Sequence, residues 1–313
     1  MGQADPSRTS CKWMMPVVVL ALMISGCGDD IKSSDVNEVP SLIVVSPHQD
    51  DETIMAGGLL YRAAHDGSTK IDIIYVTAGD AAGIAGPCRE DSEEEKKRKI
   101  IELREEETRA ACRVLGIAPS QIHFLRHPDK GLVEKSRLSY GRRVDELTEA
   151  GEQAVAHVVD LLPRLVPPNA ASLLVITTSF WDGHPDHRTT YHAARSAAEV
   201  VRIQRGIPVT ILHAIVHDDI PFPICCPGDL FWPNNGPLLD HAALFGFPPW
   251  RPRPPSWDRV LDVEDVAAFR AEALNQHVSQ IVGYPDLCMT VYLPRYYQAW
   301  LEKTEEAFWE EAL

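Results

Sequence analysis

Five short apolar runs alternate with helical patterns along the chain, and this alternation restricts the possible fold more than any other feature. The expected strands are residues 41–46, 70–80, 122–125, 172–179 and 209–217. The expected helices between and after them are residues 57–65, 92–115, 151–165 and 187–205. Apolar runs separated by amphipathic helices are typical of βαβ units, so the sequence predicts an α/β fold with a mostly parallel sheet.

Composition and charge limit the class of protein. The chain has 313 residues, of which 45% are hydrophobic and 24% charged, as expected for a globular protein. One α/β domain of this size is common, and we expect a single domain over residues 41–313. The formal net charge of −15 argues against binding to nucleic acid and against electrostatic attraction to anionic lipid.

The first forty residues have the layout of an export signal followed by a tether. Arg8 and Lys12 precede an apolar run over residues 13–24, and the segment then ends in ISGC, which resembles a bacterial lipobox. We therefore expect a lipoprotein signal peptide over residues 1–26, lipidation of Cys27 and a polar tether over residues 27–40. The protein would then lie outside the cytoplasm in a bacterial cell envelope, held to the membrane by this lipid. A simple signal peptide or a short anchor remains the alternative.

Two clusters of polar residues follow two of the expected strands. SPHQDDE, with His48 and Asp51, follows the first strand, and WDGHPDHRTT, with His184 and His187, follows the fourth. Ligands bind at the carboxyl ends of parallel strands, where such loops converge. Two histidines and one aspartate, with a position left for water, are typical of a catalytic zinc site. No G-x-G-x-x-G follows the first strand, which argues against a dinucleotide-binding domain.

These clusters belong to a longer ordered pattern. The chain carries, in order, PHQDDE, TAGD, an R-x-x-E-x-x-x-A-x-x-x-L-G helix, FLRHPDKGL and HPDH, with a weaker late echo in ALNQHVSQ. Together they closely resemble the PIG-L/LmbE-like family of zinc-dependent N-acetylglucosaminyl deacetylases. The likeness runs from residue 41 to about residue 195. It implies a Rossmann-like sheet, with helices on both faces and zinc at the carboxyl ends of the strands.

The resemblance also implies roles for particular residues. The zinc ligands would be His48, Asp51 and His187. Asp50 would be the general base, and His184 would face the developing oxyanion or donate a proton to the leaving amine. Asp186 would orient His184.

Weaker expectations concern the substrate and two departures from the family pattern. Arg104 and Asp129 would hold sugar hydroxyls. Gln49 replaces the usual proline, which predicts a less rigid loop. Asp182 replaces a tyrosine found in some members, and a carboxylate there is expected to raise the pKa of His184. Glu52 is expected to be structural, because acids often hold backbone amides at helix starts.

The sequence therefore predicts a zinc-dependent de-N-acetylase acting on an N-acetylated sugar or glycoconjugate. The alternatives are an amidase acting on a different amide and a sugar-binding lipoprotein without turnover. Another divalent metal is not excluded, because two histidines and an aspartate do not select zinc by affinity alone. The Pro-rich segment 245–258, with Trp250 and Trp257, is either a surface loop or the rim of a pocket. We expect the remaining histidines to have no special role: His65, His123, His157, His192, His213, His217, His241 and His277.

Overall fold

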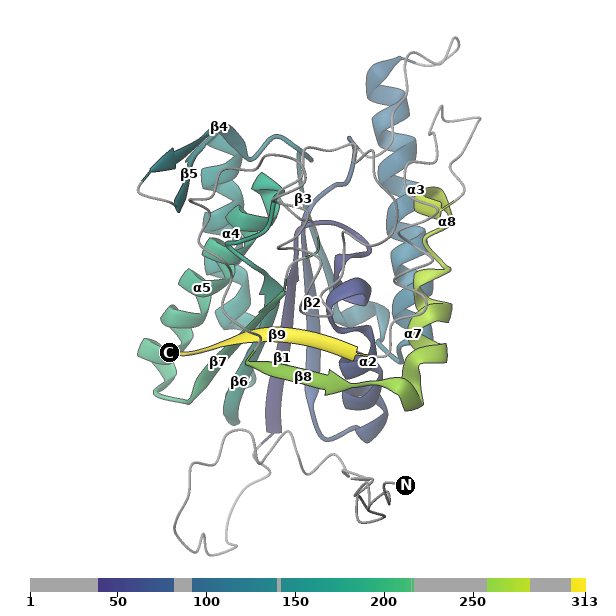
Figure 1. Cartoon of the computed structure of the whole chain (residues 1–313), viewed down its shortest axis with the longest axis vertical. Coiled ribbons are helices and arrows are strands. Elements are labelled where there is room, and N and C mark those ends of the chain that lie inside the picture. The colour runs from purple at the N-terminus through teal and green to yellow at the C-terminus, as the bar shows by residue number, and fades with distance from the viewer. Residues whose placement is uncertain (1–38, 82–91, 140–141, 215, 217–257, 282–304) are drawn as a thin grey trace, which may run out of the picture. The chain divides into compact units, whose positions relative to one another are not determined.

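The described part of the chain is built on one mixed sheet (Figure 1). The computed structural model describes residues 39–81, 92–139, 142–214, 216, 258–281 and 305–313. Across these residues the seven strands run in the order β3-β2-β1-β6-β7-β9-β8. Their bounds are β1 Val39–Ser46, β2 Lys70–Thr77, β3 Ile122–His127, β6 Ala170–Thr178, β7 Val209–Ala214, β8 Arg259–Asp262 and β9 Glu305–Ala312.

The first five strands in this order form the parallel α/β arrangement that the sequence predicts. The pairs β1–β2, β2–β3, β1–β6 and β6–β7 are all parallel. β9 then joins β7 antiparallel, and β8 joins β9 antiparallel. The strand order reverses between β1 and β6, which makes that junction the topological switch point where such sheets bind ligands.

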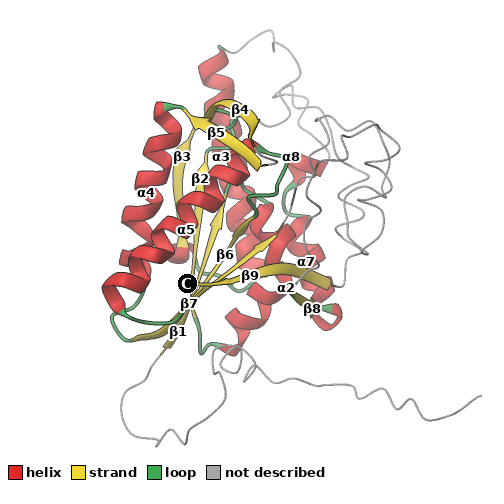
Figure 2. Cartoon of the chain, turned by 60° about the vertical axis from the view of Figure 1, so that its left-hand side comes forward, coloured by secondary structure: helices red, strands yellow, loops and turns green. Residues whose placement is uncertain are grey.

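Helices cover both faces of the sheet. α4 (Glu149–Leu165) and α5 (Pro185–Arg205) pack together on one face, and α2 (Asp51–Asp66) and α3 (Glu93–Val114) lie on the other (Figures 1 and 2). α7 (Ala267–Leu274) packs on α2 and α3, and α8 (Val278–Ile281) contacts α3. Apolar side chains of β1, β2, β6 and β7 form a continuous core with α4 and α5.

Several elements went unrecognised in the sequence. The hairpin of β4 (Val133–Ser139) and β5 (Arg142–Leu147) forms a separate two-stranded sheet. β8, β9, α7 and α8 were not predicted either. The expected strands and the four expected helices are otherwise present, with α2 beginning at Asp51 instead of residue 57. No helix among the described residues is long and apolar enough to cross a membrane.

α2 contains a break that a buried ion pair repairs. Ala56 has non-helical torsion angles (φ −144°, ψ 21°), so the helical hydrogen bonds around it are interrupted. The Glu306 carboxylate on β9 accepts instead from the backbone amides of Gly58 (2.7 Å) and Leu59 (3.0 Å). Arg270 on α7 donates to the Ile54 carbonyl oxygen and lies 3.5 Å from Glu306.

A glycine in α2 allows this close packing. A Cβ at Gly58 would lie 2.7 Å from Val263 side-chain carbons, so any larger residue there would force the C-terminal elements away. Arg270 and Glu306 are both fully buried. The C-terminal segments are thus attached to the helix that begins at the end of β1.

We expect Glu306→Ala to lower the free energy of unfolding by about 3–5 kcal/mol, because it leaves the Arg270 charge buried without its partner. Glu310→Ala on the same strand removes only a partly exposed pair with Arg259 and should cost about 1 kcal/mol or less. Denaturant unfolding followed by tryptophan fluorescence measures both. Equal losses would show that the break in α2 does not depend on Glu306.

Asp50, immediately before α2, has a strained backbone. Its φ of 128° lies in the region that favours glycine. Arg104 donates to the carbonyl oxygen of Gln49 (2.6 Å), and the Asp50 amide donates to the Glu52 carboxylate (3.1 Å). The expected structural role of Glu52 is thereby confirmed. The peptide group that joins Gln49 to Asp50 is therefore held at both its carbonyl oxygen and its amide.

This strain gives a stability test that is independent of activity. Asp50→Gly should be more stable than Asp50→Ala by about 1 kcal/mol, because relief of strain exceeds the greater freedom of glycine in the unfolded chain. Both variants lack the carboxylate, so their difference isolates the backbone. Identical unfolding midpoints would mean that residue 50 is not strained in the folded protein.

Candidate metal and catalytic site

The candidate site lies where the carboxyl ends of β1 and β6 meet. The loop after β1 carries His48 and Asp50 and leads to Asp51 at the start of α2, and the loop after β6 carries His184 and leads to His187 in α5. Asp129, Asp186 and Arg104 also reach this region, from the end of β3, the first turn of α5 and the side of α3. Eight of the nine predicted site residues therefore lie together. The ninth, Cys27, is outside the described residues.

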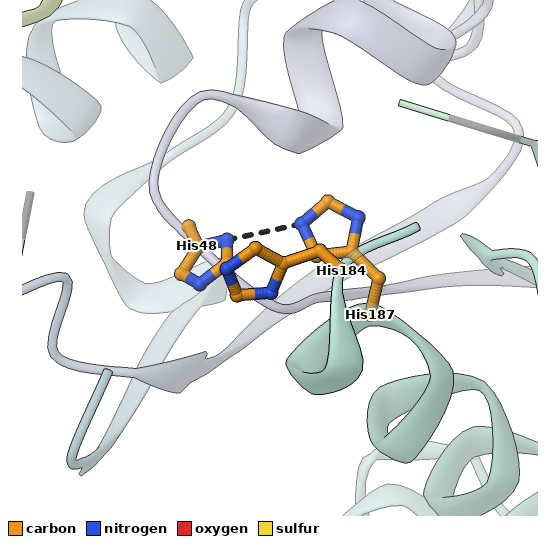
Figure 3. A group of neighbouring side chains, drawn as sticks. All are labelled: His48, His184 and His187. Atoms are coloured by element: carbon orange, nitrogen blue, oxygen red, sulfur yellow. Dashed lines mark hydrogen bonds between the residues drawn. The ribbon is translucent and has the colours of Figure 1, made fainter. Parts of the chain in front are cut away.

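Three potential ligand atoms converge at the centre of the site. His48 Nδ1 lies 3.1 Å from His187 Nε2 and 3.2 Å from Asp51 Oδ2, and the third distance, His187 Nε2 to Asp51 Oδ2, is 3.3 Å. Figure 3 shows the two rings with His184 beside them. The side chains of His48, Asp51 and His187 are all buried.

Carboxylates bind the far nitrogens of both rings. His48 Nε2 lies 3.1 Å from Asp129 Oδ1 and 3.7 Å from Asp186 Oδ2. His187 Nδ1 lies 3.1 Å from Asp182 Oδ2. These contacts place a proton on the far nitrogen of each ring, which directs the lone pair of the near nitrogen toward Asp51.

This arrangement fits a divalent metal ion. Three lone pairs repel one another unless a cation or extra protons lie between them. Tetrahedral coordination with bonds of about 2.0 Å would separate ligand atoms by about 3.3 Å, close to the three distances in this site. The histidines and the carboxylate are also the donor types that such ions take. The residues present therefore suit a divalent metal ion.

The electrostatics of the site also favour positive charge. Burial lowers the pKa of His187, but Asp182 and Asp51 outweigh it and raise the pKa to about 9. Burial likewise opposes the charged form of His48, and Asp129 is the main cause that raises its pKa well above the usual value. Burial raises the pKa of Asp51, yet the two histidines hold it well below its usual range. A cluster that attracts protons in this way attracts a metal cation for the same reason.

Asp50 lies beside these atoms without being among them. Its side chain is 13% exposed, and Arg104 Nη2 lies 3.5 Å from Oδ1. Burial raises the pKa of Asp50 to about 8, although Arg104 acts in the opposite direction. A cation at the neighbouring atoms would lower this pKa, because positive charge favours the carboxylate.

His184 caps α5 and faces the two proposed ligand rings. Its Nδ1 accepts from the Asp186 amide at 3.3 Å, so the neutral ring carries its proton on Nε2. Its centroid lies 4.9 Å from that of His48, edge to face, and 5.0 Å from that of His187. It is less buried than either ring. His184 is therefore placed to offer an N–H at the edge of the metal site.

Three predicted residues make contacts that their predicted roles did not anticipate. Arg104 donates to the carbonyl oxygens of Gln49 and Gly79, and a Cβ at Gly79 would lie 2.4 Å from its Nη1. Asp129 contacts His48 directly. Sugar binding by Arg104 and Asp129 remains a prediction. The Asp186 carboxylate accepts from the Lys130 amide at 2.7 Å, and orientation of His184 through that carboxylate also remains a prediction.

Asp182 supports His187, a contact that the sequence did not predict, and its expected effect on the pKa of His184 stays a prediction. Its carboxylate lies on His187 and accepts from the amides of His184 (2.9 Å) and Val216 (2.8 Å). The pKa that it raises is that of His187. The signal in the sequence for the contact with His187 is the position of Asp182 in a strand-end loop shortly before HPDH.

Arg188 supports the site, and the sequence did not predict it. It is almost fully buried and donates to the carbonyl oxygens of Asp182 and Gly183, both at 2.9 Å. It also forms a two-pronged pair with Asp145 on β5, at 2.7 and 2.9 Å. Arg188 thus attaches the β4–β5 hairpin to the loop that carries Asp182 and His184.

Gln49 holds its loop by a hydrogen bond from its side chain. Its Nε2 donates to the Thr77 carbonyl oxygen at 3.2 Å, and the side chain is fully buried. The predicted pocket rim after Pro221, with Trp250 and Trp257, lies outside the described residues.

Comparison with known proteins finds a family and several relatives for this chain. The family profile described as GlcNAc-PI de-N-acetylase (PIG-L) matches residues 43–198. A 1D-myo-inositol 2-acetamido-2-deoxy-alpha-D-glucopyranoside deacetylase from Actinosynnema mirum is 23% identical over 264 residues, covering 79% of this chain and 83% of that protein. The protein of the same name from Nocardia farcinica is 27% identical over 270 residues, covering 78% and 81%.

Two solved structures align over most of the chain. One is the N,N'-diacetylchitobiose deacetylase from Pyrococcus horikoshii, with 17% identity, a TM-score of 0.49 and coverage of 87% of this chain and 83% of that one. The other is the 4-carboxy-2-hydroxymuconate hydratase from Pseudomonas putida, with 18% identity, a TM-score of 0.49 and coverage of 88% and 96%. The family assignment rests on the sequence matches and on the ordered motifs. The chain belongs to the PIG-L/LmbE-like family of metal-dependent deacetylases.

Proposed function

We propose that this chain hydrolyses the N-acetyl amide of an N-acetylglucosaminyl conjugate, with zinc held by His48, Asp51 and His187. The observation that carries the metal assignment is the convergence of three ligand atoms whose mutual distances are 3.1–3.3 Å. The substrate class is supported by the family match and by the names of the relatives. Zinc, when bound, lowers the pKa of water to about 7 and polarises the amide carbonyl.

In this proposal Asp50 is the general base. It lies next to the ligand Asp51 but points its carboxylate toward Arg104, at 3.5 Å, and not to the ligand atoms. A carboxylate in that position takes the proton from the attacking water. The carbon–nitrogen bond then breaks, and the proton ends on the leaving amine, giving acetate and a free amino sugar.

In the same proposal His184 stabilises the oxyanion and protonates the leaving amine. Its Nε2–H is directed by the cap that its Nδ1 makes with Asp186, so it presents a donor to the oxygen that becomes negative. Hydrogen bonds of this kind are worth about 3–4 kcal/mol in the transition state. His184 is therefore the proposed partner of the oxyanion, and the donor to the amine when it carries a second proton.

The location of the enzyme is a separate proposal. We infer from the signal layout and the ISGC motif that the protein is exported and lipid-anchored at Cys27. The acidic net charge supports a membrane contact made by the lipid alone.

The division of roles between adjacent aspartates is directly testable. Asp50→Asn should retain a full equivalent of metal and lose at least about a hundredfold in kcat, because it removes the base but no ligand. His187→Ala should lose both metal and activity. Acetate release and metal content, measured in the same samples, check both variants. Loss of metal from Asp50→Asn would instead make Asp50 a ligand.

Asp182 offers a second test, of ligand orientation. Asp182→Asn should weaken metal binding by about 10–100-fold, because the amide no longer holds the proton of His187 as a carboxylate does. Competition with a coloured chelator measures this affinity. Asp145→Asn, which disturbs the same loop only through Arg188, is the matched control and should change the metal affinity much less. Unchanged affinity in Asp182→Asn would exclude this role.

A further inference from the structure

His277 is a buried histidine that the proposed mechanism does not use. It lies in the turn between α7 and α8, with its amide donating to the Leu274 carbonyl oxygen at 3.1 Å. Its side chain is fully buried, and neither ring nitrogen has a hydrogen-bond partner among the described residues. Burial lowers its pKa to about 3, so the ring is neutral. Burying two ring nitrogens without hydrogen bonds costs free energy, so the presence of His277 at this position needs an explanation.

The ring faces a carboxylate that supports the catalytic loop. His277 Nε2 lies 3.8 Å from Glu52 Oε1, and both side chains are almost completely buried. Glu52 accepts from the Asp50 amide at 3.1 Å and from the Thr53 hydroxyl at 2.7 Å. His277 thus lies directly beside Glu52, and Glu52 holds the amide of the strained residue Asp50.

Ser279, two residues further on, fixes the segment that carries His277. Its amide and hydroxyl both donate to the Glu107 carboxylate, at 2.7 and 2.6 Å. Glu107 lies one turn after Arg104 on α3, and Arg104 donates to the Gln49 carbonyl oxygen at 2.6 Å. The turn and α8 lie along α3 (Figure 1). The same short segment therefore touches both supports of the loop, Glu52 directly and Arg104 through its helix.

We propose that His277, set in place by Ser279, is a positioning residue for Asp50, acting through Glu52. The inference rests on the proposed role of Asp50 as general base. The family profile matches residues 43–198, and this inference assigns a role to a segment outside that range. Removing the ring leaves a cavity beside Glu52, which then shifts and releases the Asp50 peptide. The two histidine ligands stay in place because Asp129 and Asp186 hold His48 and Asp182 holds His187. The Asp51 carboxylate keeps its own hydrogen bond from the His48 amide at 3.0 Å.

The first test separates positioning from general stability. His277→Ala should keep its metal, lose about tenfold or more in kcat, and leave KM within about twofold, because a misplaced base slows the chemistry without weakening binding. His277→Asn, which keeps a polar group near Glu52, should recover part of kcat. Gln276→Ala is the matched control and should leave kcat unchanged, because within the described residues the Gln276 side chain bonds only to the Glu272 carbonyl oxygen. Ser279→Ala should resemble His277→Ala in a weaker form.

The second test asks whether the effect passes through Glu52. In a Glu52→Gln background, His277→Ala should lower kcat by less than about twofold, because the route is already broken. An equal loss in both backgrounds would overturn the proposal. So would an unchanged kcat in a folded, metal-loaded His277→Ala enzyme.

A stability measurement keeps the proposal testable if the wild type releases no acetate. The shift in denaturation midpoint caused by His277→Ala, or by His277→Asn if the alanine variant does not fold, should be at least halved in an Asp50→Gly background. Glycine at residue 50 needs no external support to adopt its backbone conformation. Equal shifts would show that His277 does not hold the Asp50 peptide. Absence of acetate release with a reduced shift would contradict the proposed function alone.

Discussion

The repulsion among three lone pairs is the constraint on which this site depends. Asp129 and Asp182 fix the protons of two imidazoles on the far nitrogens, so His48 and His187 present unprotonated atoms to Asp51. Without positive charge between them, this convergence is unfavourable in a buried site. A divalent cation turns the same geometry into a binding site. The carboxylates around the histidines therefore belong to the metal site as much as the ligands do.

The fold carries costs that serve this arrangement. Asp50 occupies a backbone region that favours glycine, and α2 breaks only six residues later at Ala56. Each irregularity is stabilised at least in part by a residue distant in the sequence. Arg104, together with the nearby Glu52, holds the peptide group between Gln49 and Asp50, and Glu306 with Arg270 replaces the hydrogen bonds lost in α2. Strain at a functional loop requires this kind of external support.

The parallel sheet and the convergence of the two polar loops could be predicted because their signals are local. Apolar runs of strand length and the motifs PHQDDE and HPDH are contiguous in the sequence, and strand ends bring them together. The supports could not be predicted in this way. Asp182 contacts the His187 ring, Arg188 reaches across to Asp145, and His277 lies more than two hundred residues from Glu52. Such contacts depend on how helices pack, which periodicity alone does not determine.

The most direct test of the account is to measure metal content and acetate release together on the purified protein. The substrates would be a panel of N-acetylglucosaminyl compounds, assayed before chelation, after chelation and after zinc is restored. The account predicts about one metal per chain, activity that disappears with the metal and activity that returns with zinc. Acetate release that persists in the metal-free protein would contradict it.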